Sequence, residues 1–270
     1  MNTLRIACLT ALAGLILSIT PAAAMDAQAV MDAVDARDTG DTAEFSTRMI
    51  LIDQRKNQRV RKMKTLKKEV NEDAKGVIFF LSPADVRNTA YMTFDWGDPA
   101  REDDSWLYLP AMAKVKRIAA GDKSGAFMGS DFSYSDINGM EIHDWTYAFA
   151  KESFDLNGVE TWVIKGQPRP EAADKVASET GYARVLLWVR KDNFLVVKAK
   201  YWVTQGKKIK FFKAEDIQQI DGIWTPMKLT MVTTQKGKVT HSTVLQVSDI
   251  RYNVPVADTR FTPAAMEQGF

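Results

Sequence analysis

The side chains of this 270-residue chain that could carry acid–base or metal chemistry are few and far apart. Its imidazoles and thiols come from His143, His241 and Cys8 alone. His143 stands beside Asp144 at the expected start of a strand, and His241 falls within an alternating strand pattern, so each is expected to be a structural or surface histidine. Two histidines without a cysteine partner do not supply the ligands of a zinc site. We expect neither a metal nor a cofactor.

Catalytic motifs are also missing. The stretch Gly121–Gly125 lacks the Gly-Lys-Ser/Thr ending of a phosphate loop and does not match the Gly-x-Ser-x-Gly nucleophile pattern. Asp103, Asp104 and Asp216 have no partner that spacing identifies. The two carboxylates of a glycosidase can be distant in sequence, so a hydrolase acting on envelope glycans stays open as an alternative. The prediction is a binding protein and not an enzyme.

The chain offers instead much large apolar surface, with seven Trp, thirteen Phe and twelve Met. Methionine adapts to ligands of irregular shape. Each methylene removed from water is worth about 0.8 kcal/mol, so a pocket lined by such residues could hold an acyl chain. The alternative is that these side chains only fill the core.

The N-terminal residues have the pattern of a secretory signal. Arg5 is followed by an apolar run, residues 6–19, and then by Pro21 and three alanines, which predicts cleavage after Ala24. The domain organisation expected is therefore a signal peptide over 1–24 and a single exported domain over 25–270. Without Arg5 there are 35 basic and 34 acidic residues, a net charge of +1, which does not suggest a nucleic-acid binder.

The elements expected to position any site are mostly strands. Residues 26–37 have the period of an amphipathic helix, and from Phe45 the period changes to two, with Phe45, Thr47, Met49 and Leu51 on one face. Asn157-Gly158 predicts a tight hairpin. We expect ten to twelve antiparallel strands in a sandwich or barrel, with an N-terminal helix and small loop helices.

Two segments fit this pattern less well. The basic run 55–68 is interpreted as a charged strand that protects a sheet edge, although it could also contact anionic lipid headgroups. Residues 166–181 break the alternation and are predicted to form an exposed loop.

The stretch from Trp106 to Ile137 organises the rest. It begins as a strand and a short basic ladder, and then enters a glycine-punctuated loop, 121–129, that leads into an aromatic segment. A long loop with aromatic and methionine side chains predicts a flap over an apolar cavity. The alternative is a connection whose aromatics seal the core.

The sequences DDSWLYLPAMAKVKRI and GAFMGSDFSYSDI, at 103–118 and 125–137, resemble outer-membrane lipoprotein-sorting proteins. Their superfamily includes the periplasmic carrier LolA, the receptor LolB and the LolA-like domain of RseB. The resemblance implies an unclosed, strongly curved half-barrel whose concave apolar face, under a lid of helices, holds acyl chains without catalysis. The chain departs from the carrier at Ser82-Pro83, where the carrier has an Arg-Pro pair whose arginine helps to latch the lid. Arg87 lies nearby in a different position.

The leading hypothesis is a periplasmic protein that holds acyl chains of a lipid or lipoprotein for transfer between the envelope membranes. Its partners would be an inner-membrane transporter and an outer-membrane acceptor. The alternative is an envelope-stress sensor or a transporter subunit that acts through protein contacts of the 55–68 or 166–181 segment. Alternation does not tell which face of the sheet is concave. If the face that carries the following residues is the concave one, the predicted cavity wall is Met92, Phe94, Trp96, Trp106 and Tyr108. The predicted lid is Phe127, Met128, Phe132 and Tyr134.

Overall fold

The computed structural model describes residues 25–71, 73–98 and 101–270. The predicted signal peptide and its cleavage after Ala24 fall on residues 1–24 and lie outside this range. No helix among the described residues is long and apolar enough to cross a membrane.

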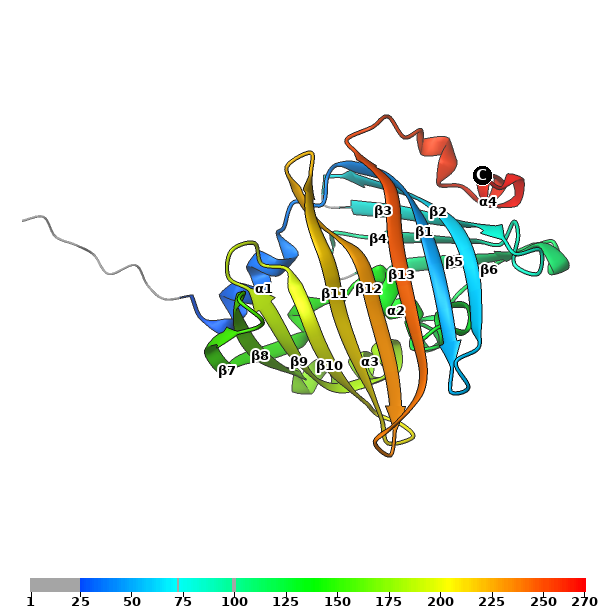
Figure 1. Ribbon diagram of the computed structural model, residues 1–270. Coiled ribbons are helices and arrows are strands. Elements are labelled where there is room, and N and C mark those ends of the chain that lie inside the picture. The colour runs from blue at the N-terminus through cyan, green and yellow to red at the C-terminus, as the bar shows by residue number, and fades with distance from the viewer. Residues whose placement is uncertain (1–24, 72, 99–100) are drawn as a thin grey trace, which may run out of the picture.

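One antiparallel sheet of thirteen strands forms the body of the molecule (Figure 1). Its strands are β1 (Thr42–Asp53), β2 (Gln58–Val70), β3 (Asp73–Ser82), β4 (Ala90–Asp95), β5 (Asp104–Leu109), β6 (Lys114–Arg117), β7 (Trp145–Asp155), β8 (Glu160–Pro168), β9 (Tyr182–Arg190), β10 (Val196–Val203), β11 (Lys208–Ile220), β12 (Ile223–Gln235) and β13 (Lys238–Tyr252). The helices are α1 (Ala27–Asp35), α2 (Tyr134–Asn138), α3 (Ala173–Thr180) and α4 (Pro263–Gln268). The prediction of an open, antiparallel, curved sheet with an N-terminal helix and small loop helices is confirmed. The sheet has one strand more than the ten to twelve expected, and it forms neither a sandwich nor a closed barrel.

The strand order determines how the chain passes across the open sheet. It runs β6-β5-β4-β3-β2-β1-β13-β12-β11-β10-β9-β8-β7, so two meanders meet where β1 pairs with β13. The two free edges, β6 and β7, are adjacent in sequence. The segment between them, residues 118–144, must therefore pass from one edge of the open sheet to the other. In Figure 1 it carries α2 behind the front strands.

The hairpin at Asn157-Gly158 forms as predicted. Both residues have positive φ, 57° and 84°, as a two-residue turn between twisted strands requires. Helix α1 also matches its prediction, since Asp26 caps it by accepting a hydrogen bond from the Ala29 amide (2.8 Å) and its apolar side, with Val30 and Met31, is buried.

The basic run is a strand, but the prediction of an edge was wrong. β2 pairs with β1 on one side and β3 on the other. Two of its outward lysines are neutralised by acids: Lys64 pairs with Glu44 (2.7 Å) and Lys68 with Asp258 (2.9 Å). A strand this basic is tolerated inside the sheet because these two lysines have acidic partners and other outward cations, such as Lys62, are exposed to solvent.

The prediction of an exposed loop over 166–181 was also wrong. β8 continues to Pro168, and residues 173–180 form α3, which buries Val176 and ends at Gly181 in the left-handed conformation. The polar composition that suggested a loop belongs to the solvent side of this short helix.

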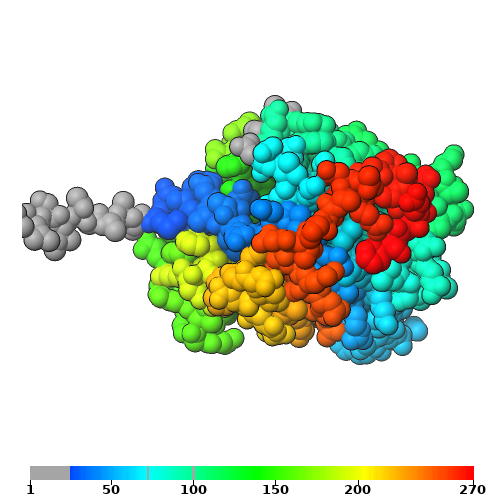
Figure 2. Space-filling view, turned by 90° about the horizontal axis from the view of Figure 1, so that it is seen from above, coloured from blue at the N-terminus to red at the C-terminus, as the bar shows by residue number. Residues whose placement is uncertain are grey.

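The buried apolar residues of the described chain form three clusters. One joins α1 to β7–β10, and a second joins the lid segment to the inner face of β1–β3, β12 and β13. The third lies on the outer face of β2–β5, where the C-terminal segment 253–270 covers it with Phe261 and Met266. Figure 2 shows this segment (red) lying against the first strands (blue to cyan).

Candidate functional site

The inner face of the sheet encloses a cavity of about 590 Å³, within the roughly 300–1,000 Å³ typical of small-molecule sites. Most of its wall is apolar. The wall includes Phe45 and Met49 from β1, Leu229 and Met231 from β12, Leu245 and Val247 from β13, Tyr201 from β10, Phe212 from β11, and Met31 and Val34 from α1.

The alternation of β1 builds part of this wall. Phe45, Thr47 and Met49 share a face, as the sequence pattern indicates, and all three line the cavity. β13 pairs with β1 in register, with Met49 opposite Leu245 and Thr47 opposite Val247, so the two central strands contribute adjacent apolar rows.

The lid closes one side of the cavity. Phe127 and Phe132, two of the residues predicted to close it, are buried and line it. Tyr134 lies in the same cluster, with its ring 5.4 Å from Phe127 and 5.3 Å from Tyr91. Met128 also packs against this cluster, in a left-handed backbone conformation with φ 49°.

A buried polar network fixes the lid to the sheet. Asp131 accepts hydrogen bonds from Thr233 Oγ1 (2.5 Å), Thr243 Oγ1 (2.7 Å) and His241 Nδ1 (2.6 Å), and its side chain is 2% exposed. A buried carboxylate is stable only when its oxygens are satisfied in this way. The network therefore ties the loop to β12 and β13.

Arg61 adds a second tie. It is buried on the inner face of β2 and donates a hydrogen bond to the carbonyl oxygen of Met128. Burial lowers the pKa of its guanidinium, with the neighbouring Arg59 acting in the same direction. Sequence reasoning identified neither tie, because the residues that meet here are 67 to 112 positions apart.

A third contact fixes α2. Ser133 and Asp136 form a reciprocal cap, in which Ser133 Oγ accepts from the Asp136 amide (3.0 Å) and Asp136 Oδ2 accepts from the Ser133 amide (2.8 Å). The same carboxylate accepts from the Tyr182 hydroxyl (2.7 Å) and pairs with Lys210 (3.3 Å). Burial, and then the Asp136 charge, raise the pKa of Tyr182 well above its usual value, so this hydroxyl stays a donor.

The other end of the cavity is polar. Asp35, Arg37, Thr39 and Lys67 line it. Lys67 extends from the inner face of β2 and has no ion pair within 4 Å among the described residues. Desolvation lowers the pKa of its ammonium group, and the charges of Glu69 and Asp95 oppose that shift. The cavity is thus apolar along its length and charged at one end.

The five residues predicted as cavity wall lie elsewhere. Their alternation is real, but they occupy the outer face of β4 and β5 and the turn after β4. Met92 is buried in the cluster under the C-terminal segment, and Phe94, Trp106 and Tyr108 pack against it. Trp96 packs on Phe94 and under the Arg101 guanidinium. The inner face of these strands carries Tyr91 and Ser105, whose hydroxyls are hydrogen-bonded at 3.2 Å.

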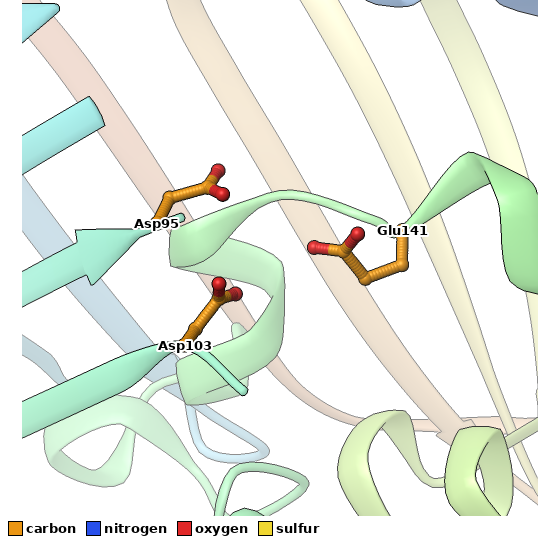
Figure 3. Close-up of side chains that lie close together, drawn as sticks. All are labelled: Asp95, Asp103 and Glu141. Carbon is orange, nitrogen blue, oxygen red and sulfur yellow. The ribbon is translucent and has the colours of Figure 1, made fainter. Parts of the chain in front are cut away.

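Three carboxylates gather near the polar end, at Asp95, Asp103 and Glu141 (Figure 3). Their oxygens lie within 4.8 Å of one another. Desolvation, followed by the charge of Asp103, raises the pKa of Asp95 to about 6 and that of Glu141 to about 7.

This acidic cluster has little room for a substrate. The hollow beside Asp103 and Glu141 holds about 20 Å³, which is space for roughly one water molecule and not for a sugar ring. Oxygen ligands of this kind suit hard cations such as Ca²⁺. Acidic groups near the surface are common without an ion, however, and we assign no metal to them.

Residues 72–268 match a family model described as "Uncharacterized protein". A comparison with curated protein sequences returns no match.

Several solved structures are similar over nearly the whole chain. A DUF1329 family protein from Desulfovibrio piger is 27% identical, with a TM-score of 0.78, over 88% of this chain and 97% of that one. A putative outer membrane lipoprotein-sorting protein domain from Vibrio parahaemolyticus is 28% identical, with a TM-score of 0.78, over 89% of this chain and 98% of that one. A LolA superfamily protein from Nitrosomonas europaea, at 20% identity and a TM-score of 0.64 over 90% and 100% of the two chains, shares the fold.

Proposed function

This chain belongs to the family whose model matches residues 72–268, within the LolA-like superfamily of outer-membrane lipoprotein-sorting proteins, and on that premise we propose that it is a periplasmic carrier of acyl chains. The observation that supports the proposal most strongly is the 590 Å³ apolar cavity on the inner face of an open sheet. The protein's own side chains leave this space unfilled.

The lining indicates how an amphiphilic ligand would lie. Its hydrocarbon would run along Phe45, Leu229 and Val247, where each buried methylene contributes about 0.8 kcal/mol. Its polar end would face Lys67 and Asp35. A donor at the inner membrane, such as a transporter, and an acceptor at the outer membrane belong to the same proposal.

The role is one of binding and not of catalysis. The name of one similar protein, from Vibrio parahaemolyticus, describes lipoprotein sorting. The polar network around Asp131 has its hydrogen-bond partners within the protein and faces the lid instead of a ligand. The hollow beside Asp103 and Glu141 has room for about one water molecule.

The test is a cavity-filling substitution with a matched control on the same strand. Val247→Trp places an indole in the cavity, whereas Val244→Trp places one on the outer face, because side chains alternate along β13. In a titration with a fluorescent fatty acid, we expect Val247→Trp to weaken binding at least tenfold and Val244→Trp to bind like the parent. Equal affinity in all three proteins would overturn the proposal.

A further inference from the structure

The outer face of the sheet has one covered half and one uncovered half. On β2–β5, the C-terminal segment packs Phe261 and Met266 onto the strands. On β9–β11, the outward side chains belong to none of the buried clusters among the described residues. This half nevertheless carries large aromatic side chains.

Strand register arranges these side chains in rows. Trp188 lies opposite Lys198, Lys200 lies between Leu186 and Phe211, and Trp202 lies between Arg184 and Ile209. The inward residues of the same strands, such as Leu187 and Ala199, are buried, so the rows face outward. We call the following set the aromatic–basic face: Arg184, Trp188, Lys198, Lys200, Trp202 and Phe211.

The cations of this face lie over its rings. The Arg184 guanidinium is 4.2 Å from the Trp202 ring centroid, Lys200 Nζ is 4.4 Å from the same ring, and Lys198 Nζ is 4.7 Å from the Trp188 ring. Both tryptophans are half-buried, so part of each ring remains open to solvent. Cation and ring together present one flat, amphipathic surface.

Three cations of this face have no acidic partner. Among the described residues, no carboxylate lies within 4 Å of the charged groups of Arg184, Lys198 or Lys200. Lys213, which stands directly opposite Lys198, is paired with Glu215 (2.7 Å). On β2, by contrast, Lys64 and Lys68 each have an acidic partner.

The unpaired cations of this face would gain partners if another molecule supplied the anions. Tryptophan is favoured where one side of a ring is apolar and the other is wet, as at the level of lipid headgroups. Lysine and arginine can extend apolar stems along such a surface while their charges meet anionic lipids. The chain as a whole is nearly neutral, so the basic character is local to this face.

We infer that the aromatic–basic face binds the surface of a membrane that contains anionic phospholipids. The contact is peripheral: the tryptophans enter the headgroup layer and the cations pair with lipid phosphates. It lies on the opposite side of the sheet from the cavity and does not depend on what the cavity holds.

The first test is co-sedimentation of the mature chain with vesicles. We expect binding to vesicles of phosphatidylcholine mixed with phosphatidylglycerol, loss of that binding at high salt, and little binding to phosphatidylcholine alone. Lys198→Gln with Lys200→Gln should weaken binding about 30-fold, since each cation near an anionic surface contributes about 1 kcal/mol. Lys114→Gln with Lys116→Gln removes the same charge from exposed positions on β6 and should leave binding unchanged.

The second test locates the contact. Vesicles with brominated acyl chains should quench tryptophan emission of the parent, and Trp188→Phe with Trp202→Phe should remove most of that quenching. Trp96→Phe with Trp106→Phe, on the other half of the sheet, should retain it. Val247→Trp, which fills the cavity, should still bind the vesicles, so docking is measured apart from lipid uptake.

Equal binding by the parent and the Lys198/Lys200 variant would overturn the inference. So would a parent that binds neither kind of vesicle, and an acidic protein surface would then be the occupant of this face.

Discussion

Apolar residues on the inner and outer faces of the sheet have different surroundings. On the outer face of β4 and β5, Met92 and its neighbours lie beneath a C-terminal segment that the chain itself supplies. On the inner face of β1 and β13, Phe45 and Val247 stand beside open space. Both sets alternate in sequence in the same way. What distinguishes a core from a binding surface here is whether another part of the chain covers it.

The largest expected effect contrasts one residue from each face. Met92→Ala should lower the free energy of unfolding by about 3 kcal/mol, because it leaves a void in a fully covered cluster, and should leave acyl affinity per folded molecule unchanged. Leu229→Gln, in the cavity wall, should cost less than about 1 kcal/mol of stability yet weaken acyl binding about tenfold. Urea unfolding and a fatty-acid titration measure the two quantities. If both variants lost affinity and stability together, the two faces would not be distinct.

A smaller effect is expected from the network that holds the lid to the inner face. Asp131→Asn removes the charge that Thr233, Thr243 and His241 share, which should cost about 2 kcal/mol. Hydrogen exchange should quicken in residues 121–137 more than in the strands. Asp122→Asn, an exposed change in the same segment, is the control. Unchanged exchange in Asp131→Asn would show that the network does not secure the lid.

The smallest effect concerns pH and the acidic cluster. The pKa values of Asp95 and Glu141 are raised to about 6 and about 7, whereas in an unfolded chain both acids titrate near 4. Between these values the two acids bind more protons in the folded than in the unfolded chain, so the stability that they contribute is fully present below about pH 4 and is lost as the pH rises towards 7.

Glu141→Gln removes most of this dependence. After allowance for solvent screening, we expect it to stabilise the protein by about 1 kcal/mol at pH 8 and to have little effect at pH 5. Glu152→Gln, an exposed change on β7, should do neither. Parallel pH profiles of the parent and Glu141→Gln would show that the carboxylates do not interact in the folded state.

Much of the fold was predictable because its signals are local. Asn157-Gly158 specifies a turn through backbone conformation, and the period-two pattern of residues 45–51 specifies a strand with one apolar face. The position of β2 was not predicted, because its basic composition is typical of an exposed edge and one of its acidic partners, Asp258, comes from the C-terminal segment 190 positions away.

The site was predictable only in part, for the same reason. The lid sequence itself supplied Phe127 and Phe132, which do line the cavity. The choice between the faces of β4 and β5 depended on where Phe261 and Met266 pack, more than 150 residues further along the chain. The ties through Asp131 depend likewise on strands that approach the loop only in the folded state.

Native mass spectrometry of the protein purified from its own cell envelope tests the central claim most directly. The account predicts that a large fraction of the parent carries the added mass of one acyl-bearing molecule, that organic extraction removes it, and that Val247→Trp purified alongside lacks it. A parent that emerges with the bare mass of its chain, or a Val247→Trp variant that carries the same added mass, would contradict it.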